Sequence, residues 1–186
     1  MKKITYNSPV VLTFAAVSLA ALILGLITDG VTTAKLFSVY RSSLTDPLTY
    51  PRFFLHVLGH SGWSHYIGNM LLFLVLGPQL EERYGSGPLL EAVAATALIS
   101  GLVQFIFFPH TALLGASGVV FMMIVLSSFT GFKKGSIPLT MILVFILYIG
   151  REVVDGLFTK DNVSQLTHII GGVCGGVFGY LLTKKR

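Results

Sequence analysis

The chain has 186 residues, of which 53% are hydrophobic and only 11% are charged, and its mean hydropathy is +0.79. A soluble globular domain carries about 25% charged residues, so this composition excludes such a domain and indicates a protein embedded in a lipid bilayer. The formal net charge is +5, but the basic residues stand at the ends of apolar segments and form no stripe with aromatic residues, so we expect no nucleic-acid partner.

The first apolar segment, 9–28, follows Lys2 and Lys3, as the apolar region of a signal peptide would. It is longer than the apolar region usual in signal peptides, and no pattern of small residues marks a cleavage site at Thr28 and Asp29. We therefore expect this segment to be retained as a membrane span.

Five further apolar segments follow at intervals that suit membrane-crossing helices, which need about 20 residues each. Residues 92–132 contain no Asp, Glu, Lys or Arg, and Pro109 with His110 divides this stretch into two. The segments lack the alternation typical of a membrane barrel. We predict an all-α fold, a polytopic bundle of six transmembrane helices in a single domain covering residues 1–186. The predicted spans lie near 9–28, 63–80, 89–108, 116–131, 137–155 and 166–183, with a long outer loop at 29–62.

The positively charged residues predict how the helices are oriented. Clusters at 2–3, 133–134 and 184–186 all fall on one side of a six-span arrangement, and the positive-inside rule makes this side cytoplasmic. We therefore expect the N- and C-termini in the cytoplasm and the protein in the cell membrane, as a multi-pass integral membrane protein. In this topology the second, fourth and sixth spans all run from the outside to the inside.

Four polar side chains lie near the outer starts of these three spans. His65 and Asn69 are four residues apart and share one face of the second span, while Ser117 opens the fourth span and His168 opens the sixth. Polar groups inside a membrane are costly and indicate a functional site. A serine and a histidine at the same depth can act as nucleophile and base, so the sequence predicts acyl chemistry inside the membrane.

Each of these residues also has a purely structural interpretation. Ser117, between glycines, could permit close helix packing, and Asn69 could join neighbouring helices through hydrogen bonds. His168 could donate to a carbonyl at the membrane interface. Only their shared depth favours the functional interpretation.

The remaining histidines and the single cysteine suggest no further chemistry. His56, His60 and His65 lie close in the sequence, but they form no His-Glu-x-x-His motif and no carboxylate accompanies them. We expect no metal site and no cofactor. Cys174 lies inside the sixth span, where it can form no internal disulfide and serves as a small packing residue.

Glycines shape the sixth span. Gly171, Gly175 and Gly179 recur at every fourth position and create a bare helix face that a neighbouring helix can approach closely. His168 lies at the edge of this face, so a close approach of the fourth span could bring it within hydrogen-bond reach of Ser117. Glycine packing without any catalytic role fits the same residues.

Four short motifs occur in the chain from Arg52 onward. They are His65-x-x-x-Asn69, then Glu81-Glu82-Arg83-Tyr84-Gly85-Ser86-Gly87, then Gly115-Ala116-Ser117-Gly118, and finally His168-x-x-Gly171-x-x-x-Gly175. In this order and spacing they resemble the motifs of the rhomboid intramembrane serine proteases, in the compact six-helix form found in bacteria.

The resemblance implies a catalytic role for five residues. Ser117 would be the nucleophile and His168 the general base, forming a dyad without a third carboxylate. His65, Asn69 and Gly115 would belong to the site that stabilises the oxyanion.

The resemblance also implies structural roles. Glu81 and Arg83 would match a structural pair at the inner end of the second span, and Gly171 and Gly175 a helix-packing face. Phe121 stands where this family commonly has a tyrosine that stacks on the histidine; it can pack on the ring but offers no hydroxyl.

By this resemblance the protein would be an intramembrane serine endopeptidase that needs no cofactor and cleaves transmembrane-helix substrates near the outer face of the lipid bilayer. One alternative is a catalytically inactive relative that binds transmembrane helices without cutting them. Another is a small-solute transporter that uses the polar cluster as its pathway, although no paired inverted repeat is visible. The sequence leaves the oligomeric state and the physiological substrate open.

Overall fold

A computed structural model of the chain describes residues 5–131, 138–144, 146–147 and 162–184. Within these ranges all regular structure is helical, apart from an isolated antiparallel bridge between Val39 and Leu113. The all-α prediction is therefore confirmed for the described part of the chain. The helices are α1 (Pro9–Ile27), α2 (Val31–Leu36), α3 (Thr49–Leu55), η1 (His56–Leu58), α4 (Trp63–Tyr84), α5 (Ser86–Phe107), α6 (Ser117–Ser128), η2 (Phe129–Gly131), α7 (Leu139–Val144) and α9 (Asn162–Lys184).

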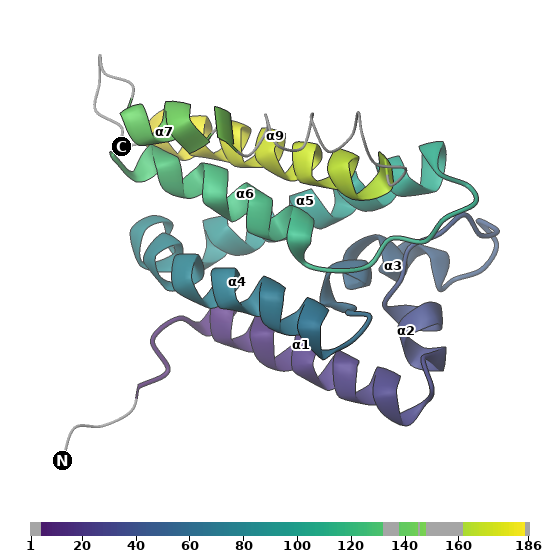
Figure 1. Ribbon diagram of the computed structural model, residues 1–186. Coiled ribbons are helices and arrows are strands. Elements are labelled where there is room, and N and C mark those ends of the chain that lie inside the picture. Colours follow the sequence, from purple (N-terminus) through teal and green to yellow (C-terminus); the bar gives the residue numbers. More distant parts are fainter. Residues whose placement is uncertain (1–4, 132–137, 145, 148–161, 185–186) are drawn as a thin grey trace.

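The long helices form a bundle. Figure 1 shows α1, α4, α5, α6 and α9 packed side by side, with α2 and α3 gathered at one end. The start of α1 and the end of α9 lie at the opposite end of the bundle (Figure 1). Helices α4, α6 and α9 run in the same direction (Figure 1). The start of α6 lies beside the amino-terminal parts of α4 and α9, because a Cβ atom on Gly115 would touch His65 and one on Gly118 would touch Thr167.

Three of the described helices are long and apolar enough to cross a membrane. They are Pro9–Ile27, Ser86–Phe107 and Gln165–Lys184. Helix α4 is as long as α5, with 22 residues, but polar side chains such as His65 and Asn69 make it less apolar. Helix α6 is apolar but has only 12 residues. The apolar helices indicate an integral membrane protein, as the composition predicts.

The count of six spans stays a prediction. Helix α7 lies within the predicted span at 137–155, but most of that segment and the lysines at 133–134 fall outside the described residues. The cytoplasmic placement of the termini likewise stays a prediction.

Helix α6 occupies the middle of the bundle. Nine of its 12 residues are buried, and it packs against α4, α5 and α9. A Cβ atom on Gly171 would overlap the carbonyl group of Gly118, and one on Gly175 would overlap that of Met122. These two glycines let the backbones of α9 and α6 come into direct contact.

Glu81 joins three segments at the end of the bundle remote from α2 and α3. Its buried carboxylate accepts hydrogen bonds from the backbone N–H groups of Val10 and Val11, both at 3.0 Å, and from the hydroxyl of Ser86 at 2.7 Å. The first N–H groups of a helix have no partner within the helix, and a negative charge is favourable beside them. Glu81 therefore caps α1 from α4.

The segment 29–62, the predicted outer loop, is folded around a buried arginine. Arg52 is 4% exposed; its Nε donates to the carbonyl of Lys35 at 2.7 Å, and its Nη1 forms an ion pair with Asp46 at 3.1 Å. Its guanidinium carbon also lies 4.7 Å from the centre of the Tyr40 ring. Because these contacts satisfy a cation that would be costly to bury alone, they hold the loop in one conformation.

Candidate active site

Ser117 is the half-buried first residue of α6, and the outer loop holds the chain that leads to it. Leu113 and Val39 exchange two backbone hydrogen bonds of 2.9 Å, and the N–H of Gly115 donates to the carbonyl of His56 at 2.9 Å. Gly115 has a φ of 120°, which favours glycine. The segment that precedes Ser117 in the chain is thus held at two points, Leu113 and Gly115.

His65 and Asn69 extend from α4 toward Gly115. A Cβ atom at Gly115 would lie 2.7 Å from both Nε2 and Cε1 of His65 and 3.7 Å from Nδ2 of Asn69. A larger residue at this position would strike the imidazole, so the close approach requires glycine. The structure therefore brings together three residues expected at the oxyanion site, just before Ser117 in the chain.

The buried amide of Asn69 lies beside Gly115. Asn69 is 8% exposed, and its Nδ2 has no hydrogen-bond acceptor among the residues that the structure describes. Buried amide groups are normally paired, and an unpaired one costs about 1–3 kcal/mol. A role in joining helices would need an acceptor for this group, whereas an unpaired donor close to Gly115 suits the binding of a transient negative charge.

The second nitrogen of His65 contacts Ser61. Its Nδ1 lies 3.4 Å from the backbone nitrogen of Ser61 and 3.2 Å from the Ser61 hydroxyl. Because a backbone N–H can only donate, Nδ1 is the acceptor in this contact, and the neutral ring carries its proton on Nε2. Nε2 belongs to the ring edge next to Gly115. His65 thus presents an N–H to the segment that precedes Ser117.

Two buried histidines of the outer loop pack around this site. The ring of His60 meets that of His65 edge to face, with centroids 5.0 Å apart, and its Nδ1 lies 3.1 Å from the carbonyl of Leu58. Burial lowers the pKa of His60 to about 4, with a further contribution from His65. Burial also lowers the pKa of His56 to about 4, while its Nε2 lies 3.0 Å from the carbonyl of Ala97. Both rings are therefore neutral at neutral pH.

His168 lies against the first turn of α6. Its ring stacks on Phe121, with centroids 4.2 Å apart and planes inclined by 5°. The residue before it, Thr167, also touches this turn, because a Cβ atom on Gly118 would lie 2.9 Å from the Thr167 methyl carbon. Ser117 opens the same turn, so the packing of α9 on α6 holds the histidine in the immediate surroundings of the serine.

Glu81 and Arg83 lie near the other end of α4. The contacts of Glu81 run to α1 and Ser86, and the guanidinium carbon of Arg83 lies 5.8 Å from the centre of the Tyr84 ring. The capping of α1 by Glu81 is not evident from the sequence. These residues contribute to the fold at a distance from Ser117.

Ser61, His56 and His60 contact the site but were not assigned to it from the sequence. Ser61 contacts His65, and the four-residue spacing between them is the one local signal that could have indicated it. His56 holds Gly115 through its backbone carbonyl, a contact between distant segments that no local pattern predicts.

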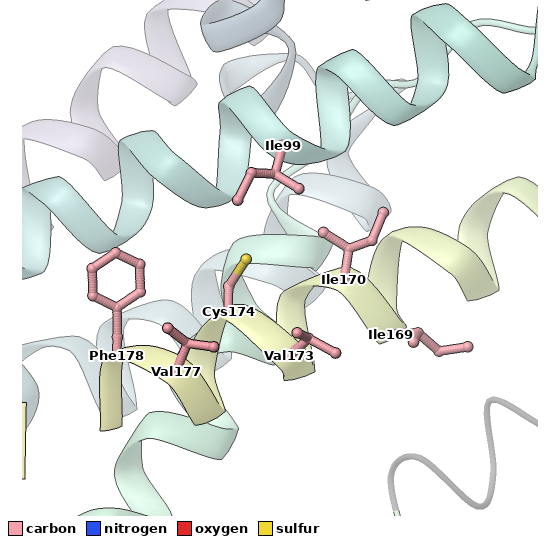
Figure 2. Close-up of a pocket in the computed structure, with 7 residues that line it drawn as sticks. All are labelled: Ile99, Ile169, Ile170, Val173, Cys174, Val177 and Phe178. Atoms are coloured by element: carbon pink, nitrogen blue, oxygen red, sulfur yellow. The ribbon is translucent and has the colours of Figure 1, made fainter. Parts of the chain in front are cut away.

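Two further features of the described residues bear on function, namely the lack of a metal-binding group and an apolar groove. No group of three or more His, Cys, Asp or Glu in the described ranges could hold a metal ion. A groove of about 240 Å³ runs between α5 and α9, where Ile99 faces the α9 side chains (Figure 2). It is lined by Ile99, Ile169, Ile170, Val173, Cys174, Val177 and Phe178. Apart from the Cys174 thiol this lining is hydrocarbon, so the groove holds no acid–base pair.

Known proteins with similar sequences indicate the family to which this chain belongs. Residues 47–185 match the family model of the Rhomboid domain. The chain is 30% identical over 158 residues to "Rhomboid-related protein 2" of Mus musculus, an alignment that covers 74% of this chain and 52% of the relative. It is 28% identical over 148 residues to "Rhomboid protease GluP" of Bacillus subtilis (strain 168), covering 76% of this chain and 28% of the relative. It is 39% identical over 71 residues to "Rhomboid protease GlpG" of Salmonella choleraesuis (strain SC-B67), covering 38% and 25%. The chain thus spans about half the length of these relatives or less.

Proposed function

Because this chain belongs to the rhomboid family, we propose that it is an intramembrane serine endopeptidase with Ser117 as its nucleophile and His168 as its general base. The observation that carries the proposal is the stack of Phe121 on His168, which holds the imidazole at the turn of α6 that Ser117 opens. The close backbone contact between Gly171 and Gly118 supports it, because it keeps α9 against this turn.

The reaction divides into two acyl transfers. A serine hydroxyl is a weak nucleophile until a positioned base removes its proton, so His168 accepts the proton as Ser117 attacks the carbonyl carbon of the scissile bond. The imidazolium then donates this proton to the nitrogen of the leaving amine, and the C–N bond breaks. Water, activated by the same histidine, hydrolyses the acyl-enzyme and regenerates Ser117. Acid–base assistance of this kind accelerates a reaction by about 10²–10⁴-fold.

The tetrahedral intermediates carry a negative charge on oxygen, which fixed donors stabilise. Three groups are available near Gly115, namely the Nε2–H of His65, the Nδ2–H of Asn69 and the backbone N–H of Ser117. The unsatisfied state of the Asn69 donor in the described residues supports this role, since binding the oxyanion would supply its missing acceptor. Donors that are already in place need no reorganisation during the reaction.

The substrates in this proposal are transmembrane proteins, cleaved near the outer end of their spans. The amino-terminal parts of α4, α6 and α9, which carry the polar site residues, all face the end of the bundle that holds the predicted outer loop (Figure 1). In the proposed six-span topology, with cytoplasmic termini in the cell membrane, this end faces outward. Water for the second acyl transfer then enters from the outer side.

A fluorophosphonate probe applied to the full chain in detergent tests the proposal. The probe should label the wild type at Ser117, and a reporter with a transmembrane helix should be cleaved; Ser117→Ala should lose both activities. Ser127→Ala is a matched control on the same helix, because the Ser127 hydroxyl donates to the carbonyl of Ile124 at 2.7 Å, toward the other end of α6.

Continued cleavage by Ser117→Ala would reject the serine-protease assignment. A folded wild type that binds the reporter helix without labelling or cleavage would instead support the inactive binding protein. Solute flux without labelling would support a transporter.

A further inference from the structure

Ser61 is an exposed residue just before α4 and contacts the side of His65 that faces away from Gly115. Its backbone nitrogen lies 3.4 Å and its hydroxyl 3.2 Å from Nδ1 of that ring. We infer that Ser61 is a positioning residue that holds His65 in the form protonated on Nε2, so that the ring donates toward the oxyanion. The inference rests on the proposed function, in which His65 stabilises that charge.

The inference follows from the hydrogen-bonding capacity of imidazole. A neutral imidazole carries one proton, on either Nδ1 or Nε2, and only the second form can donate from the ring edge beside Gly115. With the proton on Nδ1, two N–H donors would face each other across the contact with the Ser61 backbone. The Ser61 N–H therefore disfavours the unproductive form, and the hydroxyl can donate to the same nitrogen.

The start of α4 creates this contact. Gly62 is the residue that caps the helix, Trp63 is its first residue and His65 its third. In many helices a side chain at the third position accepts a hydrogen bond from a backbone N–H at the helix entrance. Here His65 accepts from Ser61, one residue earlier than usual, so the interaction that ends the outer loop also orients a proposed catalytic group.

His60 limits the other motions of the ring. It is 2% exposed, and it meets His65 edge to face with an interplanar angle of 71°. This packing restrains rotation of the imidazole but exchanges no hydrogen bond with it among the described contacts. His60 thus sets the orientation of the His65 ring, while Ser61 sets which of its nitrogens carries the proton.

The experiment combines nitrogen NMR with kinetics on the full chain in detergent micelles. Histidines are labelled with ¹⁵N, and the His65 signals are identified by their loss in His65→Gln. Wild-type His65 should carry its proton on Nε2. In Ser61→Ala, which keeps the backbone N–H but loses the hydroxyl, the Nδ1 signal should move downfield, and kcat for a transmembrane reporter should fall about 2- to 10-fold with KM unchanged.

Ser61→Thr, which retains the hydroxyl, should show the wild-type Nδ1 signal and the wild-type kcat. The neighbouring substitution Ser64→Ala should change neither the signal nor kcat. A proton on Nδ1 in the wild type would overturn the inference, and so would an unchanged kcat in Ser61→Ala. Absence of Ser117-dependent cleavage in the wild type would instead reject the proposed function. The NMR signals would still report separately on whether Ser61 sets the position of the proton.

Discussion

Helix α4 buries two polar side chains that differ in how their hydrogen bonds are met. Near its carboxyl end, Glu81 is 5% exposed and receives three hydrogen bonds, from Val10, Val11 and Ser86. Near its amino end, Asn69 is 8% exposed, and its Nδ2 has no acceptor in the described part of the chain. Among the described residues, the same helix therefore holds one polar group whose hydrogen bonds are made within the fold and one donor that has no acceptor.

In the proposed function, the amino end of α4 serves the reaction and the carboxyl end serves the fold. A buried polar group with all its partners stabilises the native state, whereas an unsatisfied one lowers stability and persists where function needs it. Substitutions around Ser117 and Asn69 should therefore lower turnover with little loss of stability. Substitutions around Glu81 should lower stability and leave the turnover of folded molecules unchanged.

The largest effect is expected for the dyad. His168→Ala should lower kcat by about 10²–10⁴-fold, because the serine loses its base. The double variant Ser117→Ala/His168→Ala should be no less active than Ser117→Ala alone, since the two residues act as one unit. Turnover and melting temperature are measured on the same preparations. A multiplicative loss in the double variant would contradict a shared step.

The next effect concerns Asn69 and His65. Asn69→Ala should lower kcat by about 10-fold or more, toward the 10²–10³-fold typical of a single oxyanion donor, with the melting temperature nearly unchanged. His65→Ala should behave in the same way. If Asn69 serves only to join helices, stability should instead fall by about 0.6–2 kcal/mol with kcat preserved. That outcome would remove the contrast with Glu81.

Acid should lower the free energy of unfolding, because protonation of His56 is unfavourable in the folded state. Burial lowers the pKa of this histidine from 6.5 to about 4, so between these values the unfolded chain binds a proton that the folded chain does not. The contribution of His56 to the free energy of unfolding should therefore be constant above about pH 6.5 and fall by up to about 3 kcal/mol as the pH drops to 4. His60, whose pKa burial also lowers to about 4, should add to the decline. Unfolding in detergent is followed across this range. His56→Asn should show a shallower decline, and an equal slope in both proteins would contradict the explanation.

A smaller loss of stability is expected at the opposite end. Glu81→Gln keeps the shape of the side chain but loses its charge, and it leaves an amide facing N–H groups of α1. The free energy of unfolding should fall by about 1.5–3 kcal/mol, the usual value of hydrogen bonds to a charged group. Glu82→Gln, at an exposed neighbouring position, is the matched control. Loss of turnover by folded Glu81→Gln molecules would show that this end also serves the reaction.

The smallest effect should come from the stack on His168. Phe121→Leu removes an aromatic contact worth about 0.5–1.5 kcal/mol, so kcat should fall about 2- to 10-fold as the imidazole gains freedom. Phe121→Tyr keeps the ring and should retain wild-type kcat. Equal activity of the Leu and wild-type proteins would mean that packing by α9 alone positions the histidine.

Much of the architecture could be predicted from the sequence because charge and hydrophobicity act locally. The run at 9–28 predicts a span where α1 covers Pro9–Ile27, and the gap around Pro109 separates α5 from α6. The all-α class follows from the same runs. The expected residues Gly115, His65 and Asn69 do lie together, because motif spacing reflects the way their helices meet.

The remaining features depend on contacts between distant segments. Two of the three partners of Glu81, Val11 and Val10, lie 70 and 71 residues away in sequence, and nothing near them indicates an acceptor. Likewise, the burial of Arg52 depends on the backbone carbonyl of Lys35, which any residue could provide. Such contacts are set by how helices and loops pack, so sequence patterns identify the residues without identifying their partners.

The shortness of α6 bears on how the protein is made. Together with η2 it forms the apolar helical segment Ser117–Gly131, whose length of about 22 Å is below the roughly 30 Å of hydrocarbon that a span must cross. Nine of the 12 residues of α6 are buried, so α6 exposes little surface to lipid. Such a segment should insert poorly into the lipid bilayer by itself. Its entry into the bilayer during synthesis should depend on α1, α4 and α5, which emerge earlier from the ribosome, and should become secure only when α9 has followed.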